Sequence, residues 1–141
     1  MSIRKSDALL VGNVMLAPDR FPVIGQKMLL KEALEEMSRH RLGIACIIDT
    51  NRRLLGILTD GDIRRMLLRV QKPFSAFFAD DALDHAITSP LSVASGDTLR
   101  YAVKLMDQRR VWDLPVVDQR GTLLGLLHLH PAVEALLGAE S

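Results

Sequence analysis

The stretch from Gly56 to Arg65, GILTDGDIRR, is the segment that decides the fold. An apolar run ends there in Thr59, Asp60, Gly61 and Asp62, and two arginines follow. This order predicts a short strand, a tight turn and the start of a basic helix. A turn alone does not need a hydroxyl, two acids and a glycine together, so the stretch is also a candidate site.

The same pattern recurs at an offset of 69 residues. The segments Ala33–Ile63 and Ala102–Ala132 align without a gap. Identical residues include the pairs Met37/Met106, Arg41/Arg110 and Asp49/Asp118 and the triplet Leu-Leu-Gly ending at Gly56 and at Gly125. A repeat of this length indicates a duplicated supersecondary unit.

Each copy predicts the element order β-α-β-β-α. Apolar residues at helical spacing favour helices at Leu30–Arg41 and from Leu99 onward, with Asp97 or Thr98 as the cap of the second one. Short apolar runs joined by polar turns predict strands, and a second helix follows them in each copy. The fold class is therefore α/β of the α+β kind, with domains at 11–69 and 85–138 and a linker at 70–84. Strands that are apolar on both faces imply helix-covered sheets, and we expect the two copies to pack as a pseudo-twofold pair.

Composition excludes several classes of function. The 141 residues include 18 basic and 17 acidic side chains, which gives no electrostatic case for nucleic-acid binding, and aromatic residues are few. No window approaches the roughly 18 apolar residues of a membrane span, and the start MSIRKSDALLVGNVM lacks the apolar core of a signal peptide. The single cysteine, Cys46, lies in an apolar run and is expected to be buried. We expect a cytoplasmic protein without nucleic-acid or membrane partners.

The chain resembles a CBS-domain pair, or Bateman module, from about Val11 to Leu137. The segments VGNVM and DHAITSPLSV resemble the starts of the two CBS domains, and LPVVDQRGTLLGLL resembles a core segment. The most specific match is GILTDGDI, in which Gly56, Thr59 and Asp62 occupy the family pattern.

The resemblance implies roles for the polar residues of this stretch. In the family, the acid at the Asp62 position holds the ribose hydroxyls of a nucleotide, and the residue at the Thr59 position helps to hold phosphate or ribose. Gly61 lets the backbone approach a ligand, and Arg64 and Arg65 can contact phosphate.

A purely structural interpretation stays open beside this one. Thr59 or Asp60 can cap the following helix with no ligand at all. Arg64 and Arg65 can equally form a solvated helix face.

The second copy departs from the pattern, because His128 and Pro131 replace Thr59 and Asp62. The ribose-binding carboxylate is missing there, so we expect at most one site of the usual type per chain. His128 and His130 share a face of an extended segment, but two imidazoles do not complete a metal site, and no metal is assigned. They remain candidates for contact with an anionic ligand, with capping and packing as the alternative.

Further candidates come from the turn between helix and strand, which in CBS pairs flanks the base of the ligand. These backbone candidates are Ile44 and Ala45 in the first copy, Asp113 and Leu114 in the second, and Pro22 in the extended segment FPVI. Trp112 lies beside them, and its alternative role is to cover the pair or dimer interface.

Within the family, the chain is most similar to the CBS pair of arabinose-5-phosphate isomerases. These proteins carry a His-x-His segment in the second copy, usually followed by an acid where this chain has Pro131. CBS pairs fused to sugar nucleotidyltransferases also contain TDGDIRR. The resemblance implies a sugar-isomerase (SIS) domain as a possible partner, and this chain has no room for one.

The expected function is that of a regulatory module rather than an enzyme, because the sequence has no Walker loop, nucleophile elbow or HExxH helix and no catalytic residue is assigned. The ligand expected from the resemblance is an adenine nucleotide, with the nucleotide-sugar CMP-Kdo from lipopolysaccharide biosynthesis as the competing candidate. The alternative is a ligand-free dimerisation module, and a homodimer is expected in either case. An isomerase activity of the chain itself is disfavoured.

Overall fold

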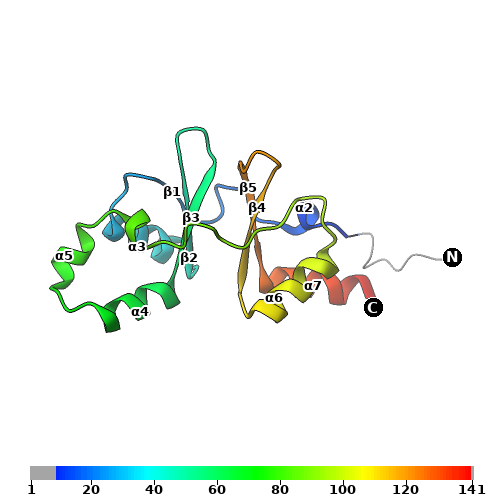
Figure 1. Cartoon of the computed structure of the whole chain (residues 1–141). Coiled ribbons are helices and arrows are strands. Elements are labelled where there is room, and N and C mark those ends of the chain that lie inside the picture. The colour runs from blue at the N-terminus through cyan, green and yellow to red at the C-terminus, as the bar shows by residue number, and fades with distance from the viewer. Residues whose placement is uncertain (1–8, 141) are drawn as a thin grey trace. The chain divides into compact units, whose positions relative to one another are not determined.

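The computed structural model describes residues 9–140, so the first eight residues of the segment tested above for a signal peptide lie outside it. The described chain forms two compact units (Figure 1). Unit 1 combines the segment up to Ala17 with the chain from Leu91 onward, and unit 2 spans Pro18–Pro90. Both mix helices with a small sheet, as predicted.

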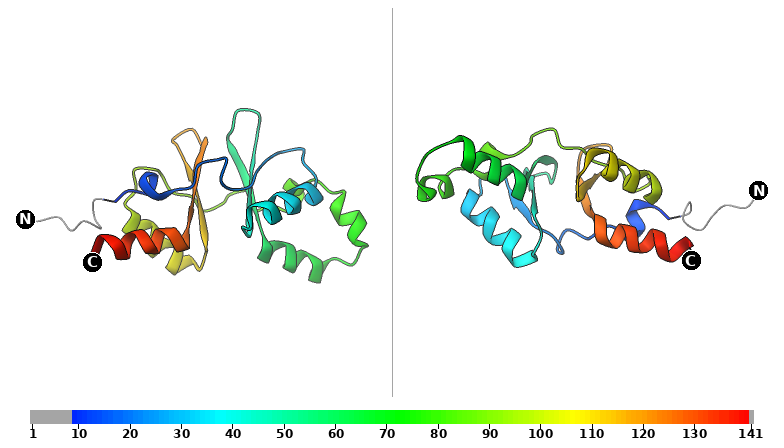
Figure 2. Two further views of the ribbon diagram at one scale, coloured as in Figure 1. Left: turned by 180° about the vertical axis from the view of Figure 1, so that it is seen from behind. Right: turned by 90° about the horizontal axis from the view of Figure 1, so that it is seen from below.

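Unit 2 follows the predicted β-α-β-β-α order. Its elements are β1 (Val23–Gly25), α3 (Leu30–His40), β2 (Ile44–Ile48), β3 (Leu54–Thr59) and α4 (Asp60–Arg69), followed by α5 (Phe74–Phe78) and the 3-10 helix η1 (Ala82–His85). The strand order is β1-β2-β3, with β1 parallel and β3 antiparallel to β2. Figures 1 and 2 show α3 and α4 on one side of this sheet.

Unit 1 repeats this plan with a shorter first strand. Its elements are α2 (Val11–Val14), α6 (Leu99–Arg109), β4 (Asp113–Val117), β5 (Leu123–His128) and α7 (Leu129–Glu140). The first strand of the predicted β-α-β-β-α order is reduced here to one parallel bridge between Val93 and Val116. Thr98, rather than Asp97, caps α6 by accepting a hydrogen bond from the Tyr101 amide at 3.2 Å.

Two residue types that are identical at equivalent positions of the repeats have the same structural role in both units. Arg41 and Arg110 end α3 and α6 in the left-handed region, with φ of 55° and 54°. Asp49 and Asp118 close the β-turns, because the Oδ1 atom of each accepts hydrogen bonds from two backbone amides at 2.8 to 2.9 Å. These hydrogen bonds, chiefly the one from the Thr122 amide, lower the pKa of Asp118.

The outer edge of each sheet is closed by a segment from the other repeat. Ile87, which follows the second repeat's expected start, exchanges backbone hydrogen bonds of 2.8 and 3.0 Å with Ile57 on β3. Leu16, which follows the first repeat's expected start, exchanges backbone hydrogen bonds of 2.7 and 3.1 Å with Leu126 on β5.

Glycine at positions 56 and 125 permits these crossings. A Cβ atom on Gly56 would lie 2.7 Å from the carbonyl oxygen of Ile87, and one on Gly125 would lie 2.7 Å from that of Leu16. Both oxygens belong to the backbone, which cannot move aside as a flexible side chain can. The Leu-Leu-Gly triplets therefore mark the point where the closing segment crosses its strand.

The predicted boundaries do not coincide with these units. The segment 70–84, expected to be a linker, contains α5 and most of η1 and belongs to unit 2. Residues 11–17, expected to belong to the first domain, lie in unit 1, whereas the rest of that domain lies in unit 2. The reason is the edge pairing just described, which joins each leading segment to the sheet of the other repeat.

The cores follow the predicted helical periodicity. Leu30, Ala33 and Met37 on α3 and Leu99, Ala102 and Met106 on α6 are all buried. Cys46 is buried on β2 as expected. Among the described residues, no helix is both long and apolar enough to span a bilayer.

Candidate functional site

The first turn of α4 holds the most specific residues of the sequence analysis. Thr59 ends β3, opposite Ile44 in the β2–β3 register, and becomes the N-cap of α4. Its Oγ1 accepts a hydrogen bond from the amide of Asp62 at 3.2 Å. The amide of Asp60 donates to the carbonyl of Gly43 at 3.0 Å, which fixes the helix start against β2.

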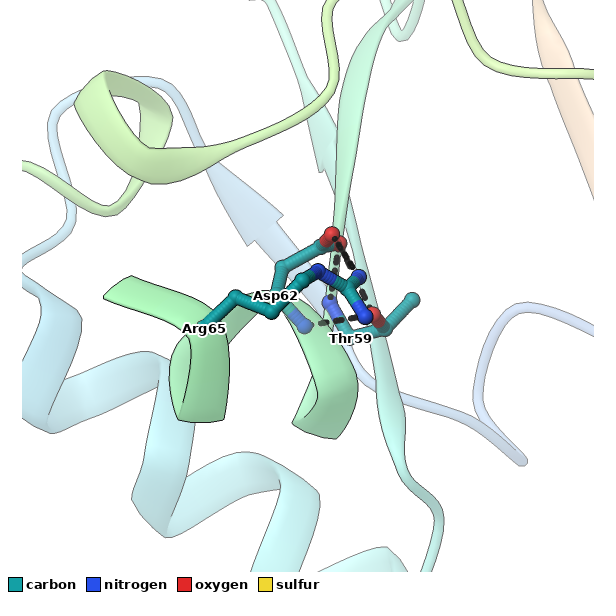
Figure 3. A network of polar contacts seen from close by, with 3 residues as sticks. All are labelled: Thr59, Asp62 and Arg65. Atoms are coloured by element: carbon teal, nitrogen blue, oxygen red, sulfur yellow. Dashed lines mark hydrogen bonds and ion pairs between the residues drawn. The ribbon is translucent and has the colours of Figure 1, made fainter. Parts of the chain in front are cut away.

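The Asp62 carboxylate is fully engaged in this turn (Figure 3). Its Oδ2 accepts hydrogen bonds from the amide and the hydroxyl of Thr59, at 3.2 and 2.8 Å. Its Oδ1 accepts one from Nη2 of Arg65 at 2.7 Å. The Asp62 side chain is 12% exposed, so this reciprocal capping box and ion pair replace most of its water. The capping interpretation is thus realised in the structure, and a ligand role for Asp62 stays a prediction.

The guanidinium of Arg65 lies against Gly61. A Cβ atom at Gly61 would meet Nη1 of Arg65 at 3.2 Å and Nη2 at 3.4 Å. The missing side chain therefore leaves room for the guanidinium over the first turn of the helix. Arg65 is 59% exposed, whereas Arg64 has no part in this network and points to solvent.

A groove of about 570 Å³ runs along α4 and contains this network at one end. It is lined by Asp62, Arg65, Met66, Leu68 and Arg69 on α4 and by Asp84, His85, Ala86 and Ile87 at η1 and the segment after it. Arginine, imidazole and carboxylate groups thus lie beside apolar surface, a composition suited to a polar organic ligand.

The wall formed by η1 is anchored by a second polar cluster. Oδ2 of Asp80 lies 2.8 Å from both Nζ of Lys72 and Nε2 of His85. The hydrogen bond from Lys72, followed by the one from His85, lowers the pKa of Asp80. His85 is 19% exposed and is held in place by this contact with Asp80.

The equivalent corner in unit 1 is built differently. Asp113 and His128 face each other in the β4–β5 register, and Oδ1 of Asp113 lies 2.7 Å from Nδ1 of His128. Burial is the main cause that raises the pKa of Asp113, against a lowering by the hydrogen bond to His128. His130 is exposed and lies 3.2 Å from Glu134 on α7.

The predicted site residues fall into two sets, one in each unit. Unit 2 contains Pro22, Ile44, Ala45 and the run from Thr59 to Arg65, and unit 1 contains Asp113, Leu114, His128 and His130. Pro22, Ile44, Ala45 and Leu114 are buried. The carbonyl of Pro22 accepts a hydrogen bond from the amide of Cys46, so it is part of the sheet.

Sequence reasoning missed the far wall of the groove. Arg69, one turn beyond Arg65, was detectable from helical spacing. The residues on the other side of the groove were not detectable, because nothing in the sequence indicates that the segment after the first repeat turns back onto α4. These residues are Asp84, His85, Ala86 and Ile87. Among the described residues, no group of three or more His, Cys, Asp or Glu side chains is arranged to hold a metal ion.

The sequence model of the CBS domain family matches residues 11–69 and 82–136 of this chain. The chain therefore belongs to the CBS domain family, and it contains a pair of these domains.

Bacterial proteins that are longer than this chain resemble it in sequence. An uncharacterized Helicobacter pylori protein is 34% identical over 126 residues, which are 89% of this chain and 37% of that protein. Arabinose 5-phosphate isomerase KdsD of Yersinia pestis is 32% identical over 127 residues, 90% of this chain and 37% of the isomerase. The chain thus spans little more than a third of the length of these relatives.

Among solved structures, CBSX2 in complex with AMP is 28% identical, with a TM-score of 0.81 over 94% of this chain and 99% of that one. A second structure, of the CBS-pair protein CBSX2 from Arabidopsis thaliana, is also 28% identical, with a TM-score of 0.77 over 92% of this chain and 95% of that one. These likenesses confirm the predicted CBS-pair fold.

Proposed function

We propose that this CBS pair is a regulatory module that binds a nucleotide or nucleotide-sugar in the groove along α4. The observation on which the proposal depends is the groove itself, in which a mostly buried carboxylate, Asp62, lies beside Arg65 and Arg69. A carboxylate accepts hydrogen bonds from both hydroxyls of a ribose diol. An arginine pair suits the phosphate.

The AMP complex of CBSX2 supports an adenine nucleotide as the first ligand to test. The similarity to arabinose 5-phosphate isomerases supports CMP-Kdo as the competing ligand and a sugar-phosphate isomerase, through its SIS domain, as the regulated enzyme. Ligand binding acts on that partner by favouring one of two conformations of the module.

A thermal-shift screen of the whole chain tests this proposal. The ligands are AMP, ADP, ATP, S-adenosylmethionine, CMP, CMP-Kdo and arabinose 5-phosphate. A ligand at 100 times its dissociation constant stabilises the folded state by about 2.7 kcal/mol, which raises Tm by several degrees. We expect a shift with an adenine nucleotide or with CMP-Kdo.

The control variants are Asp62→Asn and Asp107→Asn. The first removes the charged acceptor in the groove, and we expect it to abolish the shift while the protein remains folded. The second neutralises an exposed acid on α6, in the other unit, and we expect it to retain the shift. Absence of a shift with every ligand at millimolar concentration would reject the proposal.

A ligand-free dimerisation module is the second candidate, and one observation favours it. Large apolar side chains are exposed close together in the sequence: Leu67, Leu68, Val70, Phe74 and Phe78, with Leu68 80% and Phe74 66% exposed. Such exposure is typical of interaction surfaces. If this candidate is right, sedimentation shows a homodimer that dissociates in the double variant Leu68→Ser/Phe74→Ser, with no ligand effect.

A further inference from the structure

We propose that Arg65 makes the groove selective for ligands that present a vicinal diol and a phosphate ester together. The inference rests on the proposed function and defines the ligand by the two chemical groups that it must present. Nucleoside 5′-monophosphates belong to this class, and so do sugar phosphates such as ribose 5-phosphate.

The argument begins with the hydrogen-bonding capacity of Asp62. Thr59 occupies Oδ2 with two hydrogen bonds that also cap the helix. Oδ1 accepts its hydrogen bond from Nη2 of Arg65 at 2.7 Å, and it is the oxygen that a ligand can take over if Arg65 moves away. A diol that binds Asp62 must therefore compete with the guanidinium for this oxygen.

The two members of this ion pair differ in their exposure to solvent. Asp62 is 12% exposed and Arg65 is 59% exposed. A buried acceptor left without a partner is costly, so Arg65 leaves Asp62 only when hydroxyl groups take its place. The displaced guanidinium is then a planar donor free to bind phosphate at two points. Arg69 lines the same groove and adds a second positive charge.

Each half of such a ligand is disfavoured alone. A nucleoside supplies the diol but breaks the ion pair without offering the guanidinium a new partner. Inorganic phosphate offers the partner but leaves Oδ1 of Asp62 bare if Arg65 moves, and repels the carboxylate if it does not. When a ligand with both groups binds, its hydroxyls replace Arg65 at the Asp62 carboxylate, and its phosphate replaces Asp62 as the partner of the guanidinium.

The described residues at the equivalent positions of unit 1 do not form this arrangement. At the repeat offset, His130 stands where Gly61 gives the guanidinium room, and Glu134 stands where Arg65 supplies the charge. The exchange of partners is thus a property of the α4 corner, and Arg65 is a specificity-determining residue there.

Titration calorimetry on the whole chain tests the inference. The dissociation constants of AMP, adenosine, ribose 5-phosphate and inorganic phosphate are compared in the wild type and in Arg65→Gln. We expect the wild type to bind AMP at least about tenfold more tightly than adenosine. In Arg65→Gln this ratio falls to near one, because AMP binding weakens while adenosine binding is retained or improves. Ribose 5-phosphate distinguishes a sugar-phosphate site from one that needs the base.

The control is Arg109→Gln, which removes an exposed arginine charge from α6 in the other unit and should leave the ratio unchanged. Arg65→Lys keeps the charge without the fork and should give an intermediate ratio. An unchanged ratio in Arg65→Gln, or equal weakening of AMP and adenosine, overturns the role of Arg65 while leaving the proposed function in place. If none of the nucleotides, the nucleoside or ribose 5-phosphate binds the wild type, the proposed function fails and this inference fails with it.

Discussion

The corner where β3 meets α4 and the corner where β5 meets α7 are equivalent in the repeat, but they hold their carboxylates differently. In unit 2 the acid is Asp62 on the helix, bonded to Thr59. In unit 1 it is Asp113 on strand β4, paired with His128. His128 occupies the position of Thr59, so both carboxylates lie beside the same position of the fold.

The difference shows that the corner in unit 1 still contains a carboxylate, although the aspartate of the motif is absent there. The sequence places Pro131 at the Asp62 position, which suggested that the second corner has no carboxylate. The neighbouring strand supplies one instead, at the position that is Ile44 in unit 2. The partner changes accordingly, from a neutral hydroxyl to a titratable imidazole.

The largest expected effect on stability comes from the glycine that both units have at the strand crossing. Gly56→Ala and Gly125→Ala should each reduce the free energy of unfolding by about 2–3 kcal/mol, because the added methyl group meets a backbone oxygen at 2.7 Å. Urea unfolding measures the loss, and Gly96→Ala, with open space around it, is the control. If only one of the two variants is destabilised, the crossings are not equivalent.

The corner in unit 1 gives the next largest effect. His128→Ala removes the partner of a carboxylate that is only 10% exposed, and it should cost about 2 kcal/mol. The double variant Asp113→Ile/His128→Thr, which introduces the residues of unit 2, should recover most of this loss in urea unfolding. A double variant as unstable as His128→Ala would show that the pair is not what the corner requires.

At the corner in unit 2, Thr59→Ala should cost about 1 kcal/mol, the usual price of a lost N-cap. Thermal unfolding without ligand measures it. Thr98→Ala, which removes the cap of α6, is a matched comparison and should show a similar loss. A much smaller loss for Thr59 would mean that Asp62 and Arg65 hold the turn without it.

The β-turns of the two repeats differ in a way that predicts a small gain. Arg52 has a φ of 65°, and Gly121 has a φ of 82° at the equivalent position. Arg52→Gly should stabilise unit 2 by about 0.5 kcal/mol, because glycine adopts this region without steric cost. The reverse change, Gly121→Arg, should destabilise unit 1 in the same urea assay, and equal signs for both would contradict the explanation.

The smallest effect is the pH dependence that Asp113 contributes in unit 1. Burial raises the pKa of Asp113 above its ordinary value of 3.8, so the folded state binds this proton more tightly than the unfolded state. The stability that the group contributes is therefore fully present below pH 3.8 and is lost as the pH rises through the raised pKa. The stability of the wild type relative to Asp113→Asn should fall across that window, and a rise would contradict it.

Much of the fold could be predicted because the repeated residues have local roles. Helical spacing predicted α3 and α6, and the turn acids Asp49 and Asp118 bond backbone amides a few residues away. The start of α4 was predictable for the same reason, since Thr59 and Asp62 act on each other within one turn.

The rest depends on contacts that the sequence does not encode locally. Leu16 and Ile87 close equivalent sheet edges, but they are not related by the 69-residue offset, so the alignment of the repeats does not pair them. The position of His85 on the wall of the groove depends on that closure. Asp113 was proposed for backbone contacts, and its carboxylate became visible only once β4 and β5 were in register.

The edge pairing also sets an order for folding during synthesis. Unit 2 is contiguous in the chain, so all of its parts have left the ribosome once Pro90 has emerged. Residues 9–17 are made before unit 2, whereas their partner strand β5 is made after it. Because domains fold as units during elongation, unit 2 can fold while residues 9–17 still lack their partner strand, and unit 1 can be completed only after β5 has been made.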